Sequence, residues 1–186
     1  MPPFPIALAS IALVGFWLIE IFLRTGGSAR SWRTTAVDRG STIAVVLAYI
    51  FVAIALTVQL GGPRLPVWGQ WAGALLASAG VALRIAAFRT LGSSYSRTLR
   101  ITEEQALVTH GIYRFIRHPG YASAILIWSG AAAASGSVVV LVVIGAVLVG
   151  VYVYRIRAEE RMLAQAFGAA YQQYQARSWR LLPYVY

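Results

Sequence analysis

Polar side chains that could bind an anion gather in one stretch of this chain, residues 110–121, HGIYRFIRHPGY. Pro119 directly follows His118, and a proline both disfavours helix at the preceding residue and suits the first turn of a helix. We therefore expect His118 at a helix N-terminus, where free backbone N–H groups and a partial positive charge attract a carboxylate or a phosphate. The alternative is interfacial anchoring, in which the arginines of this stretch bind headgroups and its tyrosines belong to an aromatic belt.

A second candidate site is residues 155–161, RIRAEER. Arg155 and Glu159 lie four positions apart, so they share a helix face and can form a pair. Glu160 points about 100° away from Glu159 and needs a different cation. Carboxylates beside the membrane end of a helix are costly unless they are paired or face a wet cavity, which makes both glutamates functional candidates. A solvated helix end with snorkelling arginines is the alternative.

The two sites flank one apolar hairpin, so we expect them to meet at its open end. An anion site beside two carboxylates suits a ligand with a carboxylate, an ammonium and an apolar or aromatic part. Amino-acid-like cofactors combine these groups.

The rest of the chain is too apolar for a soluble domain. Of 186 residues, 59% are hydrophobic and 12% are charged, whereas soluble domains average about 25% charged residues. The sixteen basic residues are all arginines and cluster at the ends of apolar runs, where anionic lipid headgroups lie. We therefore expect membrane lipids, and no nucleic acid, as partners. The lack of cysteine excludes disulfides, thiol nucleophiles and thiolate metal sites.

Apolar stretches long enough to cross a membrane, which takes roughly 20 helical residues, occur five times. They are residues 4–23, 42–60, 67–91, 119–134 and 138–156. The predicted fold is an all-α integral membrane protein with about five transmembrane helices. Residues 1–66 supply the first two, and residues 67–186 supply the other three, a loop and a C-terminal amphipathic helix around a cofactor pocket. The distribution of arginines between the spans predicts an external N-terminus and a cytoplasmic C-terminus and pocket.

Three further patterns concern packing. The amphipathic helix is predicted from four residues that fall on one helical face: Leu163, Phe167, Tyr171 and Tyr174. Glu20 is expected to pair with Arg24, four positions later, and Arg84 either to snorkel or to face the cofactor pocket. Gly73 and Gly80 lie on one helix face and predict close helix packing.

Taken in order, the C-terminal motifs resemble those of the isoprenylcysteine carboxyl methyltransferase family, integral-membrane enzymes related to membrane phospholipid methyltransferases. The resemblance covers about residues 88–184. Its motifs are Leu-Val-x-x-Gly-x-Tyr, Arg-His-Pro-x-Tyr, Glu-Glu-x-x-Leu, Phe-Gly-x-x-Tyr-x-x-Tyr and a terminal Leu-Pro. The resemblance implies methyl transfer from S-adenosylmethionine to a lipophilic small-molecule or prenylated acceptor, with a carboxylate as the methylated group.

The resemblance also implies roles for individual residues. The cofactor would be bound or lined by Leu107, Val108, Gly111, Tyr113, Arg117, His118, Tyr121 and Glu160. The reaction centre would contain Arg155, Glu159, Glu160 and Arg177. By charge, Arg117 or His118 would meet the cofactor carboxylate and a glutamate its ammonium. Methyl transfer from a sulfonium needs alignment and a dry site, and no metal is expected.

One motif departs from the family pattern and leaves the acceptor open. At the position where eukaryotic isoprenylcysteine enzymes have a motif similar to Asn-Phe-x-His, this chain has Ser94, Tyr95, Ser96 and Arg97. A phospholipid N-methyltransferase, with a glutamate as base, is therefore an alternative. A membrane reductase using NADPH is another, although the chain has no Gly-rich dinucleotide motif. The third alternative function is that of a small non-catalytic membrane protein. No pattern indicates the oligomeric state.

Overall fold

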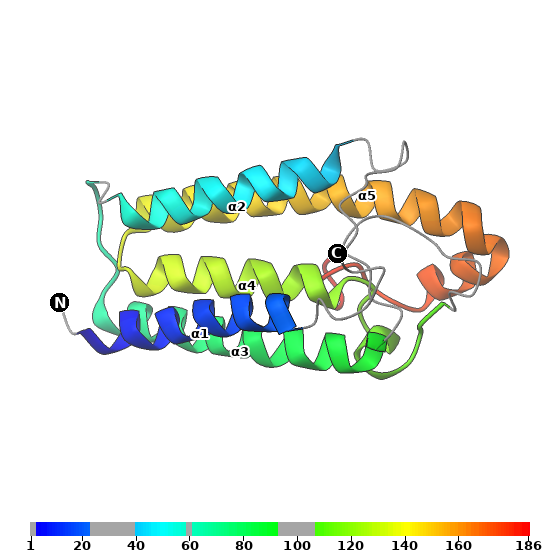
Figure 1. Ribbon diagram of the computed structural model, residues 1–186, viewed down its shortest axis with the longest axis horizontal. Helices are drawn as coiled ribbons and strands as arrows, with labels where there is room; N and C mark the ends of the chain where they lie inside the picture. The colour runs from blue at the N-terminus through cyan, green and yellow to red at the C-terminus, as the bar shows by residue number, and fades with distance from the viewer. Residues whose placement is uncertain (1–2, 23–39, 59–60, 93–106) are drawn as a thin grey trace.

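A computed structural model describes residues 3–22, 40–58, 61–92 and 107–186 of this chain. Its regular elements are α1 (Pro3–Phe22), α2 (Ser41–Thr57), α3 (Val67–Leu91), the short 3-10 helix η4 (Gly111–Arg114), α4 (Pro119–Ala134) and α5 (Val138–Ala176). The five long helices run side by side with alternating direction (Figure 1). Within the described ranges the chain forms two isolated bridges and no β-strand. The predicted all-α fold is confirmed.

In the described part of the chain, three helices are long and apolar enough to cross a membrane: α1, α3 and α5. The other two are shorter, with 17 residues in α2 and 16 in α4. A helix suits this solvent because it pairs its backbone N–H and C=O groups internally. The chain is an integral membrane protein, and five spans remain a prediction.

Helix α5 continues well beyond the predicted span because nothing in its sequence interrupts it before Gly168. There the backbone leaves helical geometry, with φ 52° and ψ −126°, a left-handed conformation that favours glycine. The remaining helical residues turn back toward the bundle (Figure 1). The predicted single amphipathic face is therefore wrong across this kink: Leu163 precedes it, and the buried Tyr171 follows it.

Helix α4 is the centre of the bundle, in contact with α1, α3 and α5. Its last five residues are one glycine and four alanines, so α3 can approach closely. A Cβ atom added at Gly73 would lie 2.5 Å from the Ala133 Cβ, and one at Gly80 would lie 2.7 Å from the Ile127 Cγ1. The prediction of close packing at these two glycines is confirmed.

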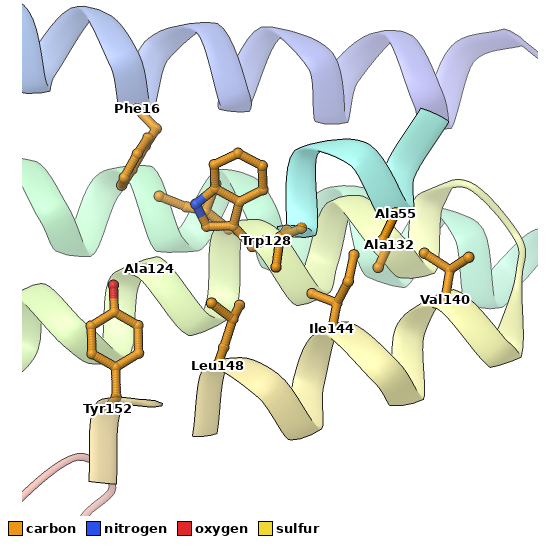
Figure 2. Packing of buried hydrophobic residues seen from close by; sticks show 11 residues of the cluster. Phe16, Ala55, Ala124, Trp128, Ala132, Val140, Ile144, Leu148 and Tyr152 are labelled. Carbon is orange, nitrogen blue, oxygen red and sulfur yellow. The ribbon is translucent and has the colours of Figure 1, made fainter. Parts of the chain in front are cut away.

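Larger side chains fill the space on the other side of α4. Phe16 of α1, Trp128 of α4, and Ile144 and Leu148 of α5 point into one shared interior, as Figure 2 shows. The Phe16 and Trp128 rings meet nearly edge to face, with centroids 5.8 Å apart. This packing fixes α1 and α5 relative to α4. The N-terminal end of α4 lies at the polar end of the bundle.

Arg84 of α3 is buried among the helices, so the expectation that it snorkels to the surface is wrong. It forms an ion pair with Glu20 of α1 and donates to the Gly120 carbonyl oxygen at 2.8 Å and to the Ser123 Oγ at 3.2 Å. Arg24, the expected partner of Glu20, lies outside the described residues. Arg84 thus ties α1 and α3 to the first turns of α4.

Candidate active site

Four parts of the chain lie at one end of the bundle (Figure 1), and hydrogen bonds join their polar groups. These parts are the start of α2, the segment from η4 to the first turn of α4, the distal half of α5, and the C-terminal segment after α5. The structure brings together six of the predicted site residues: Arg117, His118, Tyr121, Arg155, Glu159 and Glu160.

Glu160 is the most heavily paired carboxylate among the described residues. Its Oε1 accepts from the Arg117 Nε at 2.9 Å, and its Oε2 accepts from the Arg180 Nε at 2.8 Å. The His118 Nε2 lies 3.5 Å from its Oε1. Burial alone would raise the pKa of Glu160, but His118 and the two arginines lower it to about 2. The prediction that Glu160 needs a cation other than Arg155 is confirmed.

His118 lies between the two glutamates, as the residue that precedes the first turn of α4. Its Nδ1 is 3.4 Å from the Glu159 Oε2, and its ring stacks on the ring of Tyr121 at 5.5 Å. Burial would lower the pKa of His118, but the two carboxylates outweigh burial and raise it. The shift favours the imidazolium form, whose charge is opposite to that of both glutamates on α5.

Arg155 is buried, and three hydroxyl groups accept its hydrogen bonds. Its Nε donates to the Tyr121 hydroxyl at 2.9 Å, and its Nη1 donates to the Ser41 Oγ at 3.1 Å and the Thr42 Oγ1 at 2.8 Å. The sequence suggested a pair with Glu159, and the two charges do interact, since Arg155 helps to lower the pKa of Glu159. The hydrogen bonds that fix Arg155, however, come from α2 and α4.

Two buried oxygens at the site have no hydrogen-bond partner in the described part of the chain: the Glu159 Oε2 and the Tyr171 hydroxyl. The geometry between Glu159 and His118 gives a charge contact and no hydrogen bond. Buried polar atoms are normally bonded, so each marks a place for a ligand group. A carboxylate acceptor and a hydroxyl fit a ligand that carries an ammonium and hydroxyls.

The C-terminal segment pairs with the strand-like stretch before α4. The Arg117 and His118 backbone N–H groups donate to the carbonyl oxygens of Trp179 and Arg180 at 2.7 Å and 3.0 Å. Arg117 also donates from its Nη1 to the Gln175 carbonyl at 3.2 Å and to the Ser178 carbonyl. Through its Nε and Nη1 the guanidinium therefore holds this segment against α5.

Two arginines near the C-terminus have different surroundings from those that the sequence suggested. Arg177, a predicted site residue, is exposed at the end of α5. Arg180, which the sequence reasoning missed, contacts Glu160. Its place directly before the Leu-Leu-Pro motif is the signal that could have identified it. Tyr171, predicted to lie on one face of the amphipathic helix, is buried, and this burial together with the charges of Glu160 and Glu159 raises the pKa of its hydroxyl.

The other predicted cofactor-lining residues lie in and before η4. Leu107 and Val108 are half-buried, and Gly111 has a φ of 58°, which favours glycine. Tyr113 is buried, and its carbonyl oxygen accepts from the Tyr174 hydroxyl at 2.7 Å. Ser94 to Arg97, where the family pattern changes, lie outside the described residues.

Comparisons with known proteins agree with this architecture. A family model described as phospholipid methyltransferase matches residues 68–170. The chain is 34% identical to a probable protein-S-isoprenylcysteine O-methyltransferase of Oryza sativa subsp. japonica over 151 residues, which is 75% of this chain and 76% of the relative. It is 29% identical to protein-S-isoprenylcysteine O-methyltransferase B of Arabidopsis thaliana over 185 residues, 94% of this chain and 91% of the relative.

The fold also matches a solved structure, that of a eukaryotic intramembrane Ras methyltransferase, an isoprenylcysteine carboxyl methyltransferase. The TM-score is 0.65 at 24% sequence identity. The match covers 94% of this chain and 63% of that one, so this chain spans less than two thirds of the solved protein. The two proteins share a fold.

Proposed function

Because the chain belongs to the membrane methyltransferase family that contains the protein-S-isoprenylcysteine O-methyltransferases, we propose that it methylates the carboxylate of a lipophilic, prenylcysteine-like acceptor. The methyl donor in this proposal is S-adenosylmethionine. The observation that carries the proposal is the placement of opposite charges on one helix: a buried guanidinium, Arg155, lies one turn from a half-buried carboxylate, Glu159, whose buried Oε2 has no hydrogen-bond partner among the described residues.

The Arg155 side suits an anionic acceptor. The guanidinium is bonded to Ser41 at the start of α2 and to Tyr121 in the first turn of α4. Both are helix N-termini, which carry partial positive charge. The two helix ends and the guanidinium together make a place where a carboxylate is stabilised, and where an amine would be disfavoured.

The Glu159 side suits the cationic part of the donor. Glu160 already has two arginines and a histidine as partners, so Glu159 is the better candidate for the ammonium. Arg117 is engaged by Glu160 and the C-terminal segment, which leaves the N-terminus of α4 at His118 for the donor carboxylate. Tyr171 would bond a hydroxyl or amino group through its free hydroxyl.

When bound, S-adenosylmethionine supplies a methyl group on a sulfonium, and the chain supplies alignment. Arg155 would hold an acceptor oxygen in line, while Tyr121, whose hydroxyl accepts from Arg155, would place an aromatic ring beside the donor. Leu107, Val108, Gly111 and Tyr113 would line the donor from the η4 side. A carboxylate is already ionised near neutral pH, so no base is needed for it.

The donor is tested first by thermal unfolding of the protein purified in detergent. S-adenosylhomocysteine should raise the unfolding temperature, because a ligand that binds only the folded state stabilises it by mass action. NADPH is the parallel ligand. If NADPH alone raises the unfolding temperature, the reductase alternative replaces the proposal. If neither ligand raises it, the alternative of a non-catalytic membrane protein is left.

The acceptor is tested by transfer of a labelled methyl group to N-acetyl-S-farnesylcysteine, with phosphatidylethanolamine vesicles as the competing acceptor. Alkali releases methanol from a methyl ester and leaves an N-methyl group intact, so the product distinguishes the two reactions. Base-labile label on the farnesylcysteine is expected. Base-stable label on the lipid would establish the N-methyltransferase instead.

We also propose that the N-terminus lies outside and the site faces the cytoplasm, as the arginine distribution favours. The chain has no cysteine, so single cysteines can report sidedness. Val185 is 77% exposed beside the site, and Gly61 lies at the other end of the bundle with nothing within 4 Å of an added Cβ. An impermeant maleimide added to intact cells should label Gly61→Cys and spare Val185→Cys. The reverse result would invert the topology.

A further inference from the structure

The start of α2 has an unusual chemistry for a helix in an apolar bundle. Ser41 and Thr42 are its first two residues, with side chains 0% and 8% exposed. Hydroxyls at a helix start commonly bond the free N–H groups of their own helix. Here the N-cap is Gly40, with no side-chain capping bond, and both hydroxyls face α5.

Both hydroxyls accept from a single nitrogen, the Arg155 Nη1, at 3.1 Å and 2.8 Å. The Nε of the same guanidinium donates to the Tyr121 hydroxyl at 2.9 Å. When two nitrogens of a planar guanidinium are hydrogen-bonded, the orientation of its plane is fixed. The plane of the guanidinium is thus set by α2 from one side and by α4 from the other.

Helix α2 packs mainly on α5 and lies before residues 68–170, the segment that matches the family model. Its contact with Arg155 is the point at which it reaches the candidate site. A packing role alone would be served by apolar side chains, which avoid the cost of burying hydroxyls. The two hydroxyls therefore act on the orientation of Arg155.

We propose that Ser41 and Thr42 are positioning residues that hold the Arg155 guanidinium in the orientation that receives the acceptor's anionic group. This inference rests on the proposed function, in which Arg155 meets the acceptor carboxylate. It adds that the acceptor half of the site depends on α2, while the donor half, formed by α4, α5 and the C-terminal segment, does not.

The test compares Thr42→Val, which keeps the β-branched shape and removes the hydroxyl, with Thr42→Ser, which keeps the hydroxyl. Hydrogen bonds to charged groups are worth enough to change a rate roughly tenfold when one is lost. Thr42→Val should lower kcat/KM for N-acetyl-S-farnesylcysteine by about tenfold and leave the thermal shift with S-adenosylhomocysteine unchanged. Thr42→Ser should restore most of the activity.

The matched control is Thr57→Val at the other end of the same helix, where the hydroxyl is exposed and bonds the Ile54 carbonyl at 2.7 Å. It should behave as wild type. Combining Thr42→Val with Arg155→Lys should add little to the loss from Arg155→Lys alone, since the hydroxyl acts through that guanidinium. A full second tenfold loss in the double variant would overturn the proposal.

Two further outcomes separate this proposal from the proposed function. If Thr42→Val weakens S-adenosylhomocysteine binding as much as turnover, or if Thr42→Ser does not rescue, α2 is a structural support only and the proposal is wrong. If Arg155→Lys leaves turnover of the farnesylcysteine unchanged, the acceptor role of Arg155 itself fails. That result would overturn the proposed function, whatever Thr42→Val does.

Discussion

Replacing Glu160 by glutamine should destabilise the protein strongly, because this carboxylate joins three basic groups from two other segments. Arg117 and Arg180 donate to separate oxygens at 2.9 Å and 2.8 Å, and His118 lies 3.5 Å away. The Glu160 side chain is 7% exposed, so water replaces little of this interaction. Glutamine has the same shape, no charge, and only one oxygen to accept a hydrogen bond.

The expected size of the effect follows from the pKa of Glu160. Its lowering from 4.5 to about 2 favours the ionised form by about 3 kcal/mol. Breaking a buried ion pair by removing one partner costs a similar amount, about 3–5 kcal/mol. For a chain of 186 residues, about 2–4 °C of Tm per kcal/mol turns the lower figure, about 3 kcal/mol, into a loss of roughly 6–12 °C.

The same pKa predicts the pH dependence of stability. The folded-state pKa lies below the unfolded one, so the stabilisation is present above pH 4.5 and is lost as the pH falls toward 2. Wild type should therefore lose Tm over this acid range, and Glu160→Gln should lose much less. Thermal unfolding in detergent, followed by tryptophan fluorescence across pH, measures both effects.

The control for this experiment is Arg161→Gln, which removes a charge at the next helix position, where the side chain is exposed. It should leave Tm within about 2 °C of wild type. The reasoning would be refuted by a Glu160→Gln variant whose Tm also stays within about 2 °C of wild type at neutral pH and falls as much as that of wild type in acid.

Three other predictions use the same unfolding assay. His118 has a raised pKa, so its stabilisation is present below about pH 6.5 and is lost as the pH rises through the raised value; His118→Gln should flatten this alkaline decline. Gly80→Ala places a Cβ 2.7 Å from Ile127 and should cost about 1–3 kcal/mol, whereas Gly150→Ala, with open space, should cost nothing. Glu20→Gln should cost about 3–5 kcal/mol because it leaves the buried Arg84 charge without its carboxylate; a Tm near wild type would show that this pair is dispensable.

Most of the helical framework could be predicted from the sequence because its signals are local. Residues 67–91 and 119–134 were predicted with the boundaries that α3 and α4 have. Gly92 ends the first of these helices and Pro119 begins the second, so each boundary is fixed by a residue with a strong conformational preference. The kink in α5 was missed because Gly168 lies in a polar stretch and interrupts no apolar run.

The candidate site could be predicted only where its residues belong to a motif. His118, Glu159 and Glu160 were found in this way. Thr42 and Arg180 were missed, since the first contacts Arg155 across 113 positions and the second follows the last helix. A contact between distant segments depends on how α2 and the C-terminal segment pack, and this leaves no periodic pattern in the sequence.

The two helices that precede the family match are joined to the site by two buried arginines. Arg84 links Glu20 of α1 to Gly120, and Arg155 links Thr42 of α2 to Tyr121, so the first turn of α4 is held from two sides. A buried guanidinium without its partners is strongly destabilising. Residues 67–186 alone would expose both arginines to that cost, which explains why an otherwise apolar pair of helices carries a glutamate and two hydroxyls at the end where the site lies.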